Sequence, residues 1–231
     1  MKTLTLRLTA PFQSYGNRAD FGRRTTEVYP TKSAILGMVA AALGYKRNNE
    51  RIISLNTLEF AVRIEQVGQI MTDFQIVEYE KGKRKLTYRD YLQEAVFMVA
   101  LGGEDTKIDE IVYALKHPKF QLFLGRKSNP PAGPLVLRTF CEKNPLEVLG
   151  CLEWQAASWY QRKYQKDSVT LEIVADAELI LNAPQQIKRD LPKSLKVSNR
   201  LHGYRNVAIK YVKLHLREEH DVMKCLESGE I

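Results

Sequence analysis

Residues 28–48 read VYPTKSAILGMVAAALGYKRN, which places an apolar segment directly after a proline, a threonine and a lysine. Apolar residues at positions 35, 38, 39 and 43 recur at helical spacing and predict a helix over about 32–43 with one buried face. Thr31 or Ser33 can cap its first turn, and Gly44 is typical of the position after a helix end. The helix separates one predicted strand from a longer series of strands.

The segments around this helix alternate between strand and helix patterns. Leucine and threonine alternate over 2–9, residues 58–66 alternate again, and 94–101 form a continuous apolar run, so each predicts a strand. Residues 107–118 have helical spacing and 120–125 predict a further short strand. A long hairpin turns around Gly82. With this hairpin as an insertion, the order is the β-α-β-β-α-β plan of a ferredoxin-like or RRM-like α+β fold.

The pattern weakens after residue 125. Residues 129–134 are rich in turn formers, 171–181 predict one or two strands, and 207–216 alternate like a strand. We therefore expect an RRM-like domain over 1–125, with a thumb-like hairpin at about 68–92, and a smaller β-rich part over 126–231.

The chain has 231 residues and a net charge of +8, and its positive charge is segregated. No acid lies between positions 111 and 141, and nine basic residues between 185 and 217 accompany one acid, Asp190. Acids gather instead at 172–178 and 218–230. Segregated charge suits a polyanion, with nucleic acid the first candidate and an anionic membrane the second. A solvated surface remains the alternative for any single cluster.

Other residue types narrow the class of protein. The three cysteines are too far apart for a metal knuckle, and their odd number argues against a disulfide framework. No signal peptide or membrane-spanning run is present, so a reduced, cytoplasmic chain is expected. No D-x-D, H-x-H or E-x-K arrangement suggests a metal site, and no cofactor is predicted.

Candidate RNA contacts lie in the first loop, residues 10–30, at the start of the predicted helix, in the hairpin, in the loop after 120–125 and at Arg205. The start of the predicted helix, with Lys32 and Ser33, favours an anion. The hairpin tip and the loop after 120–125 supply further charge. Aromatic rings near these cations suit unstacked bases. The predicted RNA-binding residues are Gln13, Ser14, Tyr15, Arg23, Arg24, Lys32, Ser33, Lys83, Arg84, Lys85, Arg89, Arg126, Lys127, Ser128 and Arg205, and the accompanying aromatics are Phe12, Tyr15, Phe21, Tyr79, Tyr88 and Tyr204.

Four segments in order carry a family resemblance. APFQSYG, RTTEVYPTKSAILGMVAAALG, LTYRDYLQEAVFMVAL and LFLGRKSNPPAGPL resemble the CasD family of CRISPR-associated proteins, the type I-E branch of the fifth Cas family, and NRLHGYRNV is a fainter echo. The resemblance implies a non-catalytic subunit of the Cascade surveillance complex that binds and caps the 5′ handle of CRISPR RNA. It also implies that the backbone subunits and the large subunit are neighbours. Its thumb corresponds to about 68–92, its T-x-R-x-Y-L arginine to Arg89, and its basic loop to Arg126 and Lys127.

The alternative is a metal-independent endoribonuclease that processes CRISPR repeat RNA. Relatives of another subtype imply a tyrosine at the end of the first helix and a Lys-His pair near the start of the second. Tyr45 fits the first position, but the only such pair, Lys116 and His117, ends the second helix. Cleavage through a ribose 2′-OH needs a general base, an acid and a cation together. We therefore expect binding rather than catalysis.

Overall fold

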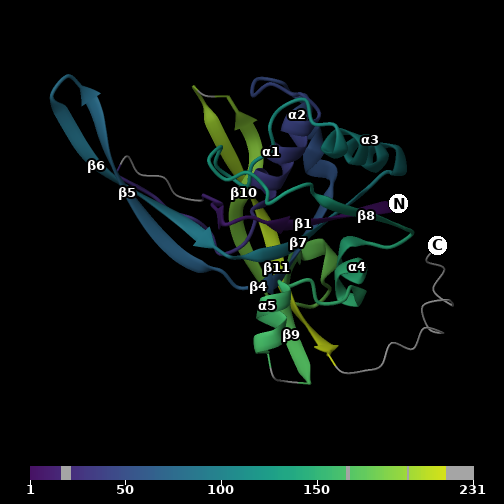
Figure 1. Cartoon of the computed structure of the whole chain (residues 1–231). Helices are drawn as coiled ribbons and strands as arrows, with labels where there is room; N and C mark the ends of the chain where they lie inside the picture. Colours follow the sequence, from purple (N-terminus) through teal and green to yellow (C-terminus); the bar gives the residue numbers. More distant parts are fainter. Residues whose placement is uncertain (17–21, 165–166, 197, 217–231) are drawn as a thin grey trace.

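The computed structural model describes residues 1–16, 22–164, 167–196 and 198–216, and it has a mixed α+β fold with a large antiparallel sheet and few helices (Figure 1). The large sheet has the strand order β10-β11-β9-β4-β7-β1-β8, and a smaller sheet contains β2, β3, β5 and β6. The strands are β1 (Lys2–Thr9), β2 (Phe12–Gln13), β3 (Arg23–Arg24), β4 (Glu59–Gln66), β5 (Gln69–Glu80), β6 (Lys83–Gln93), β7 (Val96–Gly103), β8 (Val136–Cys141), β9 (Ser168–Asp176), β10 (Gln185–Leu195) and β11 (Arg200–His215). The helices are α1 (Lys32–Ala42), α2 (Arg51–Ser54), α3 (Asp105–Lys116), α4 (Pro145–Cys151) and α5 (Ser158–Lys163), with 3-10 turns at Leu55–Thr57 and Ala177–Leu179. Within the described ranges, no helix is long and apolar enough to cross a lipid bilayer.

Apolar layers cover both faces of the large sheet. Leu4, Leu6 and Leu8 are fully buried in one core, which α1 and α3 complete on their face of the large sheet. On the opposite face, Ala61 and Met98 pack in a second core with residues of α4. The large sheet is therefore covered by α1 and α3 on one side and by α4 on the other (Figure 1).

Helix α1 confirms the prediction made from its sequence. The hydroxyl of Thr31 accepts the backbone N–H of Ala34, so Thr31 is the N-cap. The helix ends at Ala42, and Gly44 follows with φ of +79°, a conformation that glycine adopts without strain. Ala40 and Ala42 are buried in the core, and their small side chains let α1 pack closely, whereas a Cβ atom at Gly37 would meet nothing within 4 Å.

The predicted hairpin is the most prominent feature outside the layers. Strands β5 and β6 pair along their whole length around Gly82 and project away from the large sheet (Figure 1). Short strands β2 and β3 pair with β6 near its C-terminal half, so the hairpin is held at its base and extends as two strands beyond it.

The prediction of a strand over 120–125 is wrong. This segment has no strand conformation, and the partner of β1 on that side is β8, Val136–Cys141. The backbone of Leu124 is occupied by Ser14 and Asn129 instead, which precludes a regular ladder. The later strands do not stand apart: β9 pairs with β4 and with β11, so the C-terminal strands extend the same sheet.

Arg63 is the largest fully buried side chain and joins β4 to α4. It donates to Glu65 at 2.6 Å and to the carbonyls of Leu152 and Glu153 at 2.7 Å each. Arg63 therefore satisfies carbonyl groups at the C-terminal end of α4 that no helical N–H can reach. Burial raises the pKa of Glu65, and the charge of Arg63 opposes this.

Replacing Arg63 by alanine should lower the free energy of unfolding by about 3 kcal/mol, because it leaves a buried carboxylate without its partner. Without Arg63, the pKa of Glu65 rises further above its value in the unfolded chain. The folded variant then binds a proton more tightly than the unfolded chain. The stability that the variant loses relative to the wild type therefore becomes smaller as the pH falls toward the unfolded carboxyl pKa. Urea unfolding across this pH range measures both effects. Arg138→Ala, at an exposed position, is the control, and a deficit no larger than that of this control contradicts the role given to Arg63.

Candidate nucleic-acid interface

The first predicted loop meets the hairpin at its base. Strand β2 pairs antiparallel with the end of β6, and β3 runs parallel to β6. This register places Arg23 opposite Tyr88 and Arg24 opposite Arg89. Basic residues that are more than 60 positions apart in the sequence thus line up on neighbouring strands.

The loop 124–129 packs against the same base. The N–H of Ser14 donates to the carbonyl of Leu124 at 3.1 Å, and the N–H of Leu124 donates to Asn129 at 2.7 Å. Gly125 has φ of +88°, and a Cβ atom there would lie 1.6 Å from the carbonyl oxygen of Ser14. Only glycine fits this contact, so the glycine of the basic loop is explained by a close approach of two backbones.

Arg126 connects the loop to both other segments. One terminal nitrogen, Nη2, donates to the carbonyl of Arg24 at 3.0 Å, and the guanidinium carbon lies 4.6 Å from the ring centre of Tyr91. Stacking on an aromatic ring and bonding to a carbonyl fix the plane of the guanidinium. The residue is therefore held in one orientation at the hairpin base.

Two guanidinium nitrogens at the hairpin base are buried without a partner. They are Nε of Arg89 and Nη1 of Arg126, which have no hydrogen-bond acceptor within the described part of the chain. A buried donor without an acceptor costs about 1–3 kcal/mol, and more when it is charged. Native proteins seldom keep such groups without use, and an oxygen of a bound anion can supply the acceptor.

Asp90 is the buried acid of this region, and it was not among the residues predicted from the sequence. Its carboxylate accepts from Arg23 at 3.2 and 3.3 Å and from the hydroxyl of Thr72 at 2.8 Å. Arg23 still exposes 58% of its side chain, so it can meet an external anion as well. Asp90 thus fixes β3 and β5 to β6. Its place beside Arg89 in the sequence was the signal that could have identified it.

Three predicted contacts of the first loop lie inside the protein. Gln13, Ser14 and Tyr15 are at most 2% exposed. The amide of Gln13 donates to Ala95 at 2.7 Å and accepts the hydroxyl of Tyr15 at 2.6 Å. Burial raises the pKa of Tyr15 well above its ordinary range. These side chains support the loop from within, and Phe21 lies outside the described residues.

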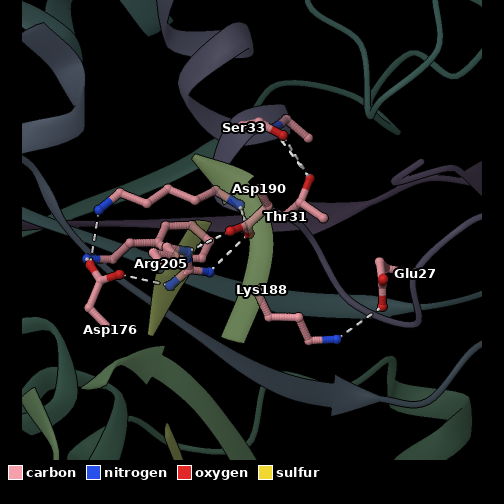
Figure 2. Close-up of polar contacts among 10 residues, drawn as sticks. Glu27, Thr31, Ser33, Asp176, Lys188, Asp190 and Arg205 are labelled. Atoms are coloured by element: carbon pink, nitrogen blue, oxygen red, sulfur yellow. Dashed lines mark hydrogen bonds and ion pairs between the residues drawn. The ribbon is translucent and has the colours of Figure 1, made fainter. Parts of the chain in front are cut away.

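Lys32 and Arg205 are also buried, in a network with two acids (Figure 2). Arg205 donates to Asp176 and Asp190 at 2.7 Å each, and Lys32 donates to Asp176 at 3.0 Å through its ammonium. Burial alone would lower the pKa of Arg205, but hydrogen bonds and charges from Asp190 and Asp176 raise it. Ser33 lies beside the network, with its hydroxyl 3.4 Å from that of Thr31.

The start of α1 already holds an anion from the protein itself. The backbone N–H of Lys32 donates to the carboxylate of Asp190 at 2.9 Å. This carboxylate occupies the position at which the sequence suggested an external phosphate, because it satisfies a free N–H and meets the positive end of the helix dipole. The helix start, with Lys32 and Arg205, is thus a different place from the hairpin base.

The hairpin tip and the basic part of loop 124–129 are exposed. Lys83 pairs with Glu80 at 2.7 Å and Arg84 with Glu78 at 3.4 Å, both on the surface. Such pairs contribute about 0–1 kcal/mol, so these cations remain available to a partner. Lys85 on the hairpin and Lys127 and Ser128 of loop 124–129 are also exposed.

One face of the hairpin is apolar, a feature that was not predicted from the sequence. Phe74 lies opposite Tyr88 and Ile76 opposite Leu86, and all four are exposed, with Phe74 and Ile76 each 64% exposed. Cross-strand partners share a face, so they form a continuous apolar strip. Alternation of apolar residues at 70, 74 and 76 was the available signal. An exposed strip of this kind marks an interaction surface.

The candidate nuclease residues do not gather in one pocket. Tyr45 lines a pocket of about 300 Å³ together with Lys107 and Glu110. His117 instead packs on Tyr113, with ring centres 4.6 Å apart and its Nδ1 atom 3.1 Å from the Tyr113 carbonyl. Neither Lys116 nor His117 belongs to the pocket lining. Among the described residues, no group of acids, histidines and cysteines could hold a metal ion.

The fold and the hairpin base define an α+β protein with a cationic site suited to an anion. A family model described as CRISPR-associated protein (Cas_Cas5) matches residues 3–208, and the chain belongs to this family. The resemblance proposed from the sequence is thereby confirmed. The chain is 30% identical over 207 residues to the CRISPR system Cascade subunit CasD of Escherichia coli (strain K12), covering 79% of this chain and 91% of that protein.

Solved structures agree with this assignment. A chain of a structure described as a CRISPR RNA-guided surveillance complex matches with a TM-score of 0.75 and 25% identity, over 98% of both chains. A second, a crystal structure described as that of a Cas protein, matches with a TM-score of 0.60 and 28% identity, over 92% of this chain and 95% of that one. The similarity therefore extends across almost the whole fold.

The packing of Gly125 against Ser14 can be isolated with a matched pair of glycines. Gly125 and Gly133 both have positive φ, but a Cβ atom at Gly133 meets nothing within 4 Å. Alanine should cost about 1 kcal/mol at either site for the backbone conformation. At Gly125 it must also displace backbone, so Gly125→Ala should lower the free energy of unfolding clearly more than Gly133→Ala. Chemical denaturation measures the difference, and equal losses would refute the close approach.

Proposed function

We propose that the protein is a non-catalytic RNA-binding subunit of a type I-E CRISPR surveillance complex. In this role it binds and caps the 5′ handle of CRISPR RNA at the hairpin base. Membership in the family and the name of the Escherichia coli relative, a Cascade subunit, support the assembly. The similarity to a chain of an RNA-guided surveillance complex supports the RNA. The cytoplasm is the compartment that we expect for such a complex.

The observation that carries the proposal is the pair of buried guanidinium nitrogens without acceptors, in Arg89 and Arg126. A phosphate oxygen satisfies a guanidinium N–H with a short, charge-assisted hydrogen bond. Arg23, Arg24 and Lys127 surround this position with further exposed positive charge. RNA phosphates at the hairpin base would therefore complete contacts that the protein alone leaves open.

The fold supports the same role. Strands β4, β7, β1 and β8 are adjacent in that order and antiparallel, and α1 and α3 connect them. We infer that they form a ferredoxin-like unit of the RRM type, with the hairpin as its thumb. In this description β8 replaces the segment 120–125 as the last strand. The division into parts at residue 125 stays a prediction, since β8 and β9 join the sheet of the first part.

Protein partners would use the apolar strip of the hairpin. Phe74, Ile76, Leu86 and Tyr88 are exposed on a two-stranded element, which is only marginally stable when left uncovered. We propose that a backbone subunit of the complex covers this strip and that the large subunit lies nearby. The basic tip, with Lys83, Arg84 and Lys85, would then reach RNA or the neighbouring subunit.

Alanine at both Arg89 and Arg126 should weaken binding of CRISPR RNA that carries its 5′ handle by at least about tenfold, since each charge-assisted bond contributes about 1.5–3 kcal/mol. Fluorescence anisotropy with this RNA, and with the same RNA lacking the handle, measures the affinity and the preference for the handle. Arg138→Ala/Lys210→Ala is the control with the same charge change, at two exposed positions. A double variant that keeps the full preference for the handle would exclude these two residues as the site.

The isolated protein should leave CRISPR repeat RNA intact. Tyr45 shares its pocket with Lys107 and Glu110 but not with His117, so no base-acid pair of the expected kind is assembled there. Incubation of labelled repeat RNA with the purified protein in EDTA tests this directly. A discrete cut that disappears in Tyr45→Phe would establish the endoribonuclease alternative instead.

A further inference from the structure

A second cationic surface lies apart from the hairpin base, between the segment after α1 and strand β10. Arg47, Lys193 and Lys196 line a pocket of about 110 Å³, together with the amides of Asn48 and Asn49. Arg200 lies opposite Leu195 in the β10–β11 pairing, and burial, followed by the charge of Arg47, lowers its pKa. We call these four cations the β10 patch.

The cations of the β10 patch, Arg47, Lys193, Lys196 and Arg200, are not paired with acids of the described residues. Asp190, the one acid of this part of the sequence, is occupied by Arg205 and by the N–H of Lys32. Glu50, at the surface, is the only acid in the pocket lining. Four neighbouring cations repel one another, and a bound anion removes this repulsion.

The patch is also positioned by the fold. A Cβ atom at Gly203 would lie 2.6 Å from the Cε atom of Lys193, so the absence of a side chain at Gly203 lets the stem of Lys193 lie along β11. Asn49 is fixed by its side-chain oxygen, which accepts the N–H of Arg51 at 2.9 Å. Lys193 on β10 and the turn that carries Arg47 are thus each held by a contact of their own.

We propose that the β10 patch binds the phosphodiester backbone of a nucleic-acid strand, as a second contact separate from the hairpin base. Lysine, arginine and asparagine side chains are the usual partners of backbone phosphates, and such contacts do not depend on base sequence. An acidic protein surface fits less well, because protein interfaces centre on exposed apolar anchors. Ile52 and Pro192 in the lining are buried, which leaves Ile53 as the one strongly exposed apolar side chain there.

The test compares two triple alanine variants of the full chain with equal loss of charge. The patch variant is Arg47→Ala/Lys193→Ala/Lys196→Ala, and the control is Arg138→Ala/Lys210→Ala/Lys213→Ala, at exposed positions on β8 and β11. Fluorescence anisotropy with labelled oligo(U) RNA and with oligo(dT) DNA is recorded over a series of salt concentrations. Removing three phosphate contacts should reduce the slope of log affinity against log salt by about 2.

The expected result is a loss of affinity of tenfold or more for both probes in the patch variant and a small, nonspecific loss in the control. Because the substituted side chains are exposed, thermal melting should remain close to that of the wild type in both. The preference for RNA that carries the 5′ handle should survive in the patch variant and fall in Arg89→Ala/Arg126→Ala. If the wild type itself shows no preference for RNA with the handle, the proposed function is wrong. The salt slopes of the two triple variants still test the β10 patch in that case.

Three outcomes would overturn the proposal. The first is a patch variant that behaves like the control with both probes. The second is displacement of the probes from the wild type by inorganic phosphate at matched ionic strength, which would indicate a site for a single phosphate. The third is normal affinity for both probes in a patch variant that no longer assembles with partner subunits, which would indicate an acidic protein surface.

Discussion

The arrangement of the large sheet depends on the buried charges around Arg205. Asp176 ends β9, Asp190 lies on β10, and Arg205 on β11 bonds to both, while Lys32 brings in the first residue of α1. The carboxylate of Asp176 also accepts the N–H of Phe60 in β4 at 2.8 Å. Buried charges are tolerated only when they are paired and fully hydrogen-bonded. Five elements therefore meet in one geometry, and α1 and the C-terminal strands are positioned by the same contacts.

Local patterns predicted most individual elements because those elements depend on local residues. The leucine alternation of β1, the capped helix α1 and the turn at Gly82 each follow from their own sequence. The prediction of a strand over 120–125 failed because the apolar alternation there reflects packing against a loop rather than pairing in a sheet. Leu124 is buried by the approach of Ser14, and the strand beside β1 comes later, at Val136–Cys141. Such pairings are set by contacts between distant residues, which no local period contains.

Basic residues in the sequence could not be sorted into internal and external ones without the structure. Lys32 and Arg205 read like Arg89 and Arg126, yet both pair with Asp176, which lies 144 positions from Lys32 and 29 from Arg205, and Arg205 also pairs with Asp190. Tyr15 read like an exposed aromatic of the loop and is a core residue, packed edge-on against Phe97. The motif around Arg126 was informative because two of its residues are needed for different reasons. Gly125 allows the close approach of the backbone of Ser14, and Arg126 stacks on the ring of Tyr91.

The attachment of the hairpin couples the binding of an anion at its base to the docking of a neighbour on its apolar strip. Arg126 from the loop stacks on Tyr91 of β6, and Asp90 of β6 holds Arg23, so the segments that border the cationic base are also the joints of the long arm. An anion seated there would stiffen the joint and narrow the range of directions in which Phe74 and Ile76 point. A neighbour docking on that strip would then lose less conformational freedom. By thermodynamic reciprocity, a neighbour that docks first would increase the affinity of the hairpin base for the anion by the same factor.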